Sequence, residues 1–150
     1  MLRLSNLADY AVLACTHLAR AEGRLSAAEL AEQTSIPAPT MAKLAGVLTR
    51  ERILISTRGP QGGVLLAREP GDISLADIIE AIDGPIGIVA CTQDDGEACQ
   101  LKDNCQARPH WPVINERVRA VLEDTTIAEL ARDSGPDRGE TERELEEVAA

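Results

Sequence analysis

Residues 26–67 read SAAELAEQTSIPAPTMAKLAGVLTRERILISTRGPQGGVLLA, and this stretch decides the fold. A capping box over 26–29 opens a helix, and a break with two prolines at 36–39 follows it. Apolar residues then recur at helical spacing over 39–51. Because a short break separates two amphipathic helices, the pattern predicts a helix-turn-helix.

A glycine-rich hairpin follows the second helix. Residues 53–57 and 64–67 are predicted strands, and RGPQGG at 58–63 supplies the turn that joins them. Two helices followed by such a hairpin are typical of a winged helix-turn-helix, which binds DNA. The same pattern is also compatible with a three-helix core whose hairpin binds a protein partner.

The flanking sequence adds helices on both sides of this unit. Residues 5–21 precede it as a helix, and a capping box at 74–77 opens another helix that ends at Gly84-Pro85. A helix over about 112–123 and a short one from Thr126 complete the chain. The predicted fold class is mainly α, a winged helix-turn-helix domain followed by further helices, the longest of them near the C-terminus.

Charge divides the chain into unlike halves. Residues 1–70 hold eight Lys/Arg and six Asp/Glu, a net of +2, whereas residues 71–150 hold seven and nineteen, a net of −12, which together give −10. Only the first half could therefore face a polyanion. We expect a DNA-binding domain over 1–70, a second unit over 71–132 with the cysteines and the C-terminal helices, and an acidic, disordered tail over 133–150.

Five residues are candidates for contact with DNA. The helix over 39–51 could enter a major groove, where Thr40, Lys43 and Arg50 would meet bases or phosphates. At the tip of the hairpin, Arg58 stands beside Gly59, and glycine lets the backbone approach a sugar-phosphate chain closely.

Three of the four cysteines, Cys91, Cys99 and Cys105, lie in a segment without helical or strand periodicity. The C-x7-C-x5-C spacing lacks the paired C-x2-C of structural zinc sites and suits a [2Fe–2S] or [4Fe–4S] cluster. A zinc site, or thiols without metal, remain alternatives. Such a cluster would be one protein ligand short, and His110, Glu97 and Asp103 are candidates. The fourth cysteine, Cys15, lies on an apolar helix face as a core residue.

Other classes of protein find little support in the sequence. No apolar run is long enough to span a bilayer and the N-terminus lacks a signal peptide, so we expect a cytoplasmic chain with reduced thiols. We find no nucleophile–base pair and no phosphate-binding loop, so we expect no enzyme.

These motifs, in this order, resemble the IscR/NsrR-type regulators, the Rrf family of winged-helix iron–sulfur regulators. The resemblance covers about residues 1–132 and is carried by the segments MLRLSNLADYAV, ISTRGPQGGVLLAR, SLADIIEAIDGPI, the cysteine loop and HWPVINERVRAVLEDTTIAEL. The opening, PAPTMAKL and the cysteine spacing are most similar to the subgroup that regulates the SUF iron–sulfur assembly system.

The resemblance implies a homodimer that represses iron–sulfur assembly genes from a palindromic DNA site. The helix over 112–123 would be a long C-terminal dimerisation helix, which pairs with the same helix of the partner subunit. Cys91, Cys99 and Cys105 would hold the cluster, and Asp9 of the partner subunit would be the fourth ligand. Other relatives use a histidine where Arg108 stands here, which favours Asp9 over His110.

The target DNA sequence does not carry over from the resemblance. Some relatives read DNA through an acidic residue near the middle of the recognition helix, and Ala42 occupies that place here. The wing contact through Arg58 and Gly59 carries over more safely.

Overall fold

The structure is a computed structural model that describes residues 3–92, 99, 101 and 104–132. The tail expected to be disordered, 133–150, lies outside these residues. The elements, in chain order, are α1 (Asn6–Arg20), α2 (Ala27–Thr34), α3 (Ala38–Arg50), β1 (Leu54–Thr57), β2 (Gly63–Leu66), the 3₁₀ turn η1 (Pro70–Asp72), α4 (Leu75–Asp83), the 3₁₀ turn η2 (Ala90–Thr92), α5 (Trp111–Asp124) and α6 (Ile127–Leu130).

The capping boxes form as predicted. At the start of α2 the Ser26 hydroxyl accepts from the Glu29 amide at 3.1 Å, and the Glu29 carboxylate accepts from the Ser26 amide at 2.7 Å. The same reciprocal pair opens α4 and α6. These bonds satisfy amides that a helix start leaves unpaired, so the helix boundaries follow from local sequence.

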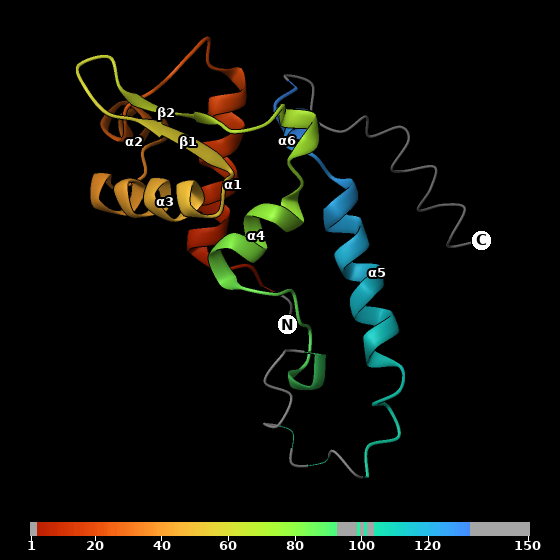
Figure 1. The fold of residues 1–150 in the computed structure, drawn as a ribbon. Helices are drawn as coiled ribbons and strands as arrows, with labels where there is room; N and C mark the ends of the chain where they lie inside the picture. The colour runs from red at the N-terminus through yellow and green to blue at the C-terminus, as the bar shows by residue number, and fades with distance from the viewer. Residues whose placement is uncertain (1–2, 93–98, 100, 102–103, 133–150) are drawn as a thin grey trace.

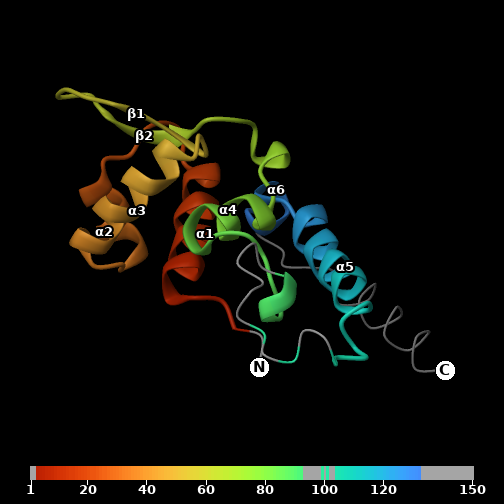
Figure 2. The same cartoon turned by 60° about the horizontal axis from the view of Figure 1, so that its bottom comes forward.

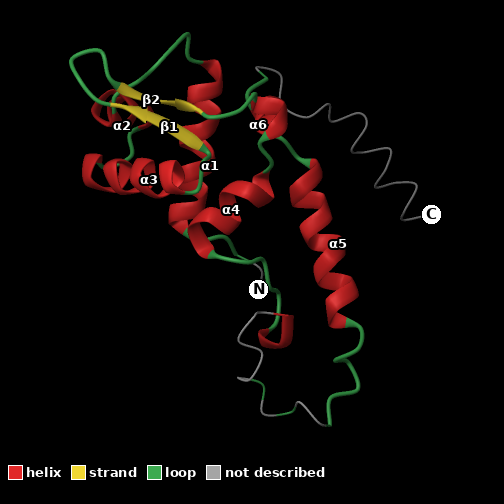
Figure 3. Cartoon of the chain, viewed as in Figure 1, coloured by secondary structure: helices red, strands yellow, loops and turns green. Residues whose placement is uncertain are grey.

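The hairpin is a two-stranded antiparallel sheet in which Leu54 pairs with Leu66 and Thr57 with Gly63 (Figure 3). Leu25, in the link between α1 and α2, also bridges to Val64 through hydrogen bonds of 3.2 and 2.8 Å. This bridge ties the start of β2, close to the turn, to the link between α1 and α2, while the tip of the hairpin projects away from the helices (Figure 1).

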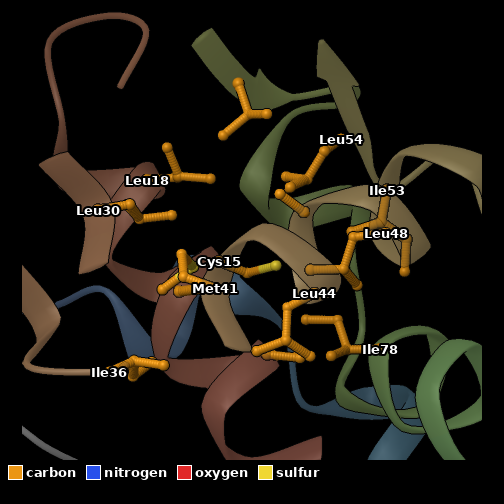
Figure 4. Close-up of a cluster of buried hydrophobic side chains, with 14 of the residues drawn as sticks. Cys15, Leu18, Leu30, Ile36, Met41, Leu44, Leu48, Ile53, Leu54 and Ile78 are labelled. Carbon is orange, nitrogen blue, oxygen red and sulfur yellow. The ribbon is translucent and has the colours of Figure 1, made fainter. Parts of the chain in front are cut away.

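One buried cluster joins the helices to the hairpin. Its members are Ala11, Ala14, Cys15, Leu18, Leu30, Ala31, Ile36, Met41, Leu44, Ala45, Leu48, Ile53, Leu54, Val64, Ile73, Ile78 and Ile127. The chain has no Phe, so aliphatic side chains supply this packing (Figure 4). Burial of these residues from five helices and both strands fixes α3 against the base of the hairpin.

The C-terminal part of the chain is attached to this core. Ile127 of α6 is fully buried, and its amide donates to the Ile73 carbonyl at 2.9 Å. The Leu75 amide donates to the Thr125 carbonyl, also at 2.9 Å. The boundary expected at residue 70 stays a prediction, while the buried cluster continues past it.

Helix α5 stands apart from α1–α3. It packs on α4 and η2, and α4 lies between α1 and α5 in both views (Figures 1 and 2). Arg119 of α5 joins Glu80 of α4 at 3.0 Å, and this pairing raises the pKa of the arginine. The mainly α fold with a small antiparallel hairpin is therefore confirmed.

Candidate DNA-binding surface and cysteine segment

Helix α3 presents two unlike faces. Met41, Leu44 and Leu48 are buried in the core, while Ala42 and Lys43 are exposed. This division follows from the apolar spacing, because residues three and four apart share one face of a helix. Small and basic side chains therefore point outward, where a partner could reach them.

The tip of the β1–β2 hairpin, which is the wing of the fold, is also exposed to solvent. Arg58 is exposed, and Gly59 adopts a φ of +112°, a backbone conformation that favours glycine. The Gly62 amide closes the turn by donating to the Gly59 carbonyl at 2.9 Å. The turn chemistry thus holds Arg58 at the outer end of the hairpin.

A groove of about 730 Å³ runs between α3 and the wing. Its lining is mostly small or polar residues, among them Ser26, Ala42, Gly46, Thr49, Thr57 and Gly59, and it includes one acidic residue, Glu29. Small side chains on both walls leave space for an extended polyanion such as a sugar-phosphate chain.

The five predicted DNA contacts are placed differently. Gly59 lines the groove, and Lys43, Arg50 and Arg58 are exposed outside its lining. Thr40 is half-buried in the first turn of α3. Ser26 was predicted only as a helix cap, and Thr49 and Thr57 were not predicted as site residues, because a groove between distant segments leaves no local pattern.

We call residues 91–105 the cysteine segment. Cys91 lies in η2, where the Thr92 amide and hydroxyl both donate to the Val89 carbonyl, at 3.0 and 2.8 Å. Cys91, Cys99 and Cys105 are half-buried free thiols. A short 3₁₀ turn therefore stands at the start of a segment that was expected to lack regular structure.

The structure does not assemble a metal centre from the predicted ligands. Among the described residues, no group of three or more His, Cys, Asp or Glu side chains is arranged to hold a metal ion. Asp9 is exposed in the first turn of α1, and His110 is exposed at the start of α5. The candidates Glu97 and Asp103 lie outside the described residues.

The thiols of the cysteine segment are chemically suited to bind metal, although in the part of the chain that the structure describes they do not converge. Three accessible thiols within fifteen residues are suitable ligands for an iron–sulfur cluster or for zinc. Cys15 differs, because its complete burial raises the pKa of its thiol to about 12. It therefore stays protonated in the core, as expected of a structural cysteine.

Comparison with known proteins decides the family. Residues 4–133 match the Rrf2 family, described as iron-dependent transcriptional regulators. The chain belongs to the Rrf2 family. It is a DNA-binding transcriptional regulator of this class, as the motifs predicted. In the part of this Rrf2 protein that the structure describes, no helix is long and apolar enough to cross a membrane.

Relatives of similar length support the assignment. This Rrf2 chain is 31% identical to the transcriptional regulator IscR of Xenorhabdus nematophila over 133 residues, 87% of this chain and 80% of that protein. It is 30% identical to IscR of Serratia proteamaculans over 131 residues, 86% and 79% of the two chains. The resemblance to IscR-type regulators is therefore confirmed over most of the sequence.

Solved structures show the same fold. CymR, the global cysteine regulator of B. subtilis, superposes with a TM-score of 0.71 at 30% identity over 87% of this Rrf2 chain and 97% of its own. IscR of T. potens superposes with a TM-score of 0.68 at 30% identity over 88% of each. Two regulators with different names thus share this architecture almost equally.

Proposed function

We propose that this Rrf2 protein is a homodimeric repressor of iron–sulfur assembly genes, closest to regulators of the SUF system, that senses through a bound iron–sulfur cluster. Three half-buried free thiols between η2 and α5, in a chain similar to IscR, carry the proposal. Cluster occupancy would shift the dimer between two geometries of different DNA affinity.

The DNA contacts proposed are those of α3 and the wing. Lys43 and Arg50 would meet the duplex from α3, and Arg58 and Gly59 from the wing, with Thr40 near the helix start. Exposure of the three basic side chains supports this assignment, because charge must reach phosphate to contribute affinity. Two copies related by a two-fold axis would require a palindromic site.

The dimer proposed uses α5. One face of α5 meets α4 through Arg119, while Val113, Ile114 and Val121 are 56%, 40% and 66% exposed. Ile114 and Val121 are seven residues apart and therefore share one side of the helix. An apolar surface of this kind is normally covered, and a second copy of α5 would cover it.

The cluster ligands proposed are Cys91, Cys99 and Cys105, with Asp9 of the partner subunit as the fourth. Three cysteines leave such a cluster one protein ligand short, and Asp9 of the partner subunit would complete the set. The bond from Asp9 would connect cluster state to α1, which packs on the core beneath α3.

One experiment tests the proposal. Protein purified without oxygen should show broad visible absorbance with matched iron and sulfide. Cys99→Ser should abolish the colour, while the matched control Cys15→Ala should keep it. Asp9→Ala should keep the colour but lose it faster in air. A colourless wild-type protein with stoichiometric zinc, even after supply of iron and sulfide, would end the cluster proposal.

A second candidate function is a thiol-based or zinc-stabilised regulator without a cluster. The likeness to the global cysteine regulator CymR favours it, as does a similar fold in oxidised CymR of Staphylococcus aureus, with a TM-score of 0.66 at 25% identity. The same metal analysis separates the two, since this candidate predicts no iron in wild-type protein.

A further inference from the structure

The side chain of Asn115 holds the backbone that leads into the cysteine segment. Its amide nitrogen Nδ2 donates to the Ile86 carbonyl at 3.0 Å, and its oxygen Oδ1 accepts from the Ile88 amide at 3.0 Å. One partner is an acceptor and the other a donor, so the pair also fixes which way the carboxamide faces. The side chain of Asn115 thus pairs with the backbone at 86–88 in the way that the backbone of a neighbouring β-strand would.

Only two residues, Val89 and Ala90, separate the Asn115–Ile88 hydrogen bond from Cys91. Val89 follows Ile88 directly, and its carbonyl accepts from both the amide and the hydroxyl of Thr92. Cys91 lies inside the turn that these bonds close, and η2 itself packs on α5. The position of Ile88 therefore determines where Cys91 lies relative to α5.

The far end of the cysteine segment leads into the same helix. The Arg108 amide donates to the Cys105 carbonyl at 3.3 Å, and the Ile114 amide donates to the His110 carbonyl at 3.2 Å. These turns run from Cys105 into α5, which begins at Trp111. Both ends of the cysteine segment are thus attached to the same helix, α5.

We propose that Asn115 is a positioning residue for Cys91, which places this thiol in a fixed relation to α5 and so to Cys105. The inference rests on the proposed cluster site, in which both thiols are ligands. Ligands need supporting hydrogen bonds that hold them close to their binding geometry. Asn115 supplies that support through backbone rather than through the thiol itself.

The first test uses metal-free protein and does not depend on a cluster. In Asn115→Ala, the Ile88 amide should exchange its hydrogen about fivefold faster, as expected for loss of one hydrogen bond. Alkylation of Cys91 should accelerate relative to Cys105, which serves as an internal reference. Unchanged exchange at Ile88, or an unchanged ratio of alkylation rates, would overturn the proposal.

Arg119→Ala is the matched control. It removes another tie between α5 and its neighbours, to Glu80, without touching the backbone at Ile86 or Ile88. We expect Ile88 exchange and Cys91 alkylation to stay within about twofold of wild type, well below the change expected for a lost hydrogen bond. If Arg119→Ala matched Asn115→Ala in both readouts, Asn115 would only help to dock α5 and the proposal would fail.

A second variant guards against misfolding. Asn115→Asp has the same shape and still accepts from the Ile88 amide, but it turns an oxygen towards the Ile86 carbonyl. We expect an intermediate rise in Cys91 alkylation, and behaviour identical to wild type would contradict the proposal.

Cluster-loaded protein gives the last readout. Loss of visible absorbance in air should be severalfold faster in Asn115→Ala than in Arg119→Ala, and equal rates would count against the positioning role. If wild-type protein takes up no cluster from iron and sulfide, the proposed function fails. The metal-free measurements then still decide whether Asn115 places Cys91.

Discussion

The Ser5 hydroxyl donates a 2.6 Å hydrogen bond to Asp83, 78 residues further along the chain. Ser5 is the N-cap of α1 and also accepts from the Ala8 amide at 3.0 Å, while Asp83 is the last residue of α4. One side chain thus caps α1 and attaches it to the end of α4. The start of α1, which includes Asp9, is thereby held close to the end of α4, where the loop that leads to Cys91 begins.

Removal of this hydroxyl should destabilise the fold. We expect Ser5→Ala to lower the free energy of unfolding by about 1 kcal/mol, the usual cost of a lost N-cap, with an unchanged slope against urea. Asp83→Asn should cost less, because its amide oxygen still accepts from Ser5. Urea titrations of both variants check this, and a neutral Ser5→Ala would show that the cap is dispensable.

Cys15 should be inert where the other cysteines react. Burial raises the pKa of its thiol to about 12, so very little thiolate exists near pH 8. Mass spectrometry after alkylation of metal-free protein should find Cys91, Cys99 and Cys105 modified and Cys15 modified only after unfolding. Native modification of Cys15 would mean that the core opens readily.

The same pKa predicts the sign of an alkaline effect. The folded-state pKa of about 12 lies above the ordinary value of 9.0, so the folded protein holds this proton more tightly than the unfolded chain. The stability that the protonated thiol contributes is therefore complete below pH 9 and is lost as pH rises towards 12. Cys15→Ala should lose less stability over that interval than wild type.

Arg58 should contribute affinity for DNA without contributing to the fold. We expect Arg58→Ala to weaken binding roughly threefold to tenfold and to reduce the salt dependence by about one phosphate contact. Arg117→Ala removes the same charge from an exposed site on α5 and should leave binding nearly unchanged. Equal effects of the two variants would point to net charge rather than a wing contact.

Val121 should be needed for the dimer. Because it is 66% exposed in the single chain, Val121→Asp should leave the subunit folded and place a charge in the proposed interface. Sedimentation should then show monomers. Ile55→Asp puts the same charge on an exposed apolar position of β1 and should remain dimeric. A dimer that survives Val121→Asp would remove α5 from the interface.

Two glycines should respond oppositely to alanine. At Gly63, with φ +145°, a Cβ would lie 2.6 Å from the Leu25 carbonyl oxygen, so Gly63→Ala should cost at least about 2 kcal/mol. At Gly46, inside α3, a Cβ would meet nothing within 4 Å, and alanine should add about 0.5–1 kcal/mol. Thermal unfolding of both variants measures the difference, and a tolerated Gly63→Ala would show that the start of β2 can shift away from Leu25.

Local chemistry made much of the fold predictable. The reciprocal cap between Ser26 and Glu29 needs residues only three positions apart, so it can be recognised in sequence. The start of α3 was placed at Pro39, whereas the helix begins at Ala38 with Pro37 as its N-cap, because proline suits several positions at a helix start. The winged-helix assignment depended on such signals.

Long-range contacts could not be predicted in the same way. The bonds from Asn115 to Ile86 and Ile88 span 29 and 27 residues, and no spacing rule connects them. The cysteine pattern named possible ligands, but their convergence depends on tertiary placement. Sequence thus supplied the chemistry of the candidate site and left its geometry open.

The burial of Ile127 has a consequence for how the protein is made. During synthesis, residues 1–70 leave the ribosome well before α6 exists, yet Ile127 belongs to the same buried cluster as the helices of that region and α6 packs on α1. Until α6 arrives, that cluster has an open apolar side. Nascent chains should therefore complete the core that supports the DNA-binding surface only late in translation.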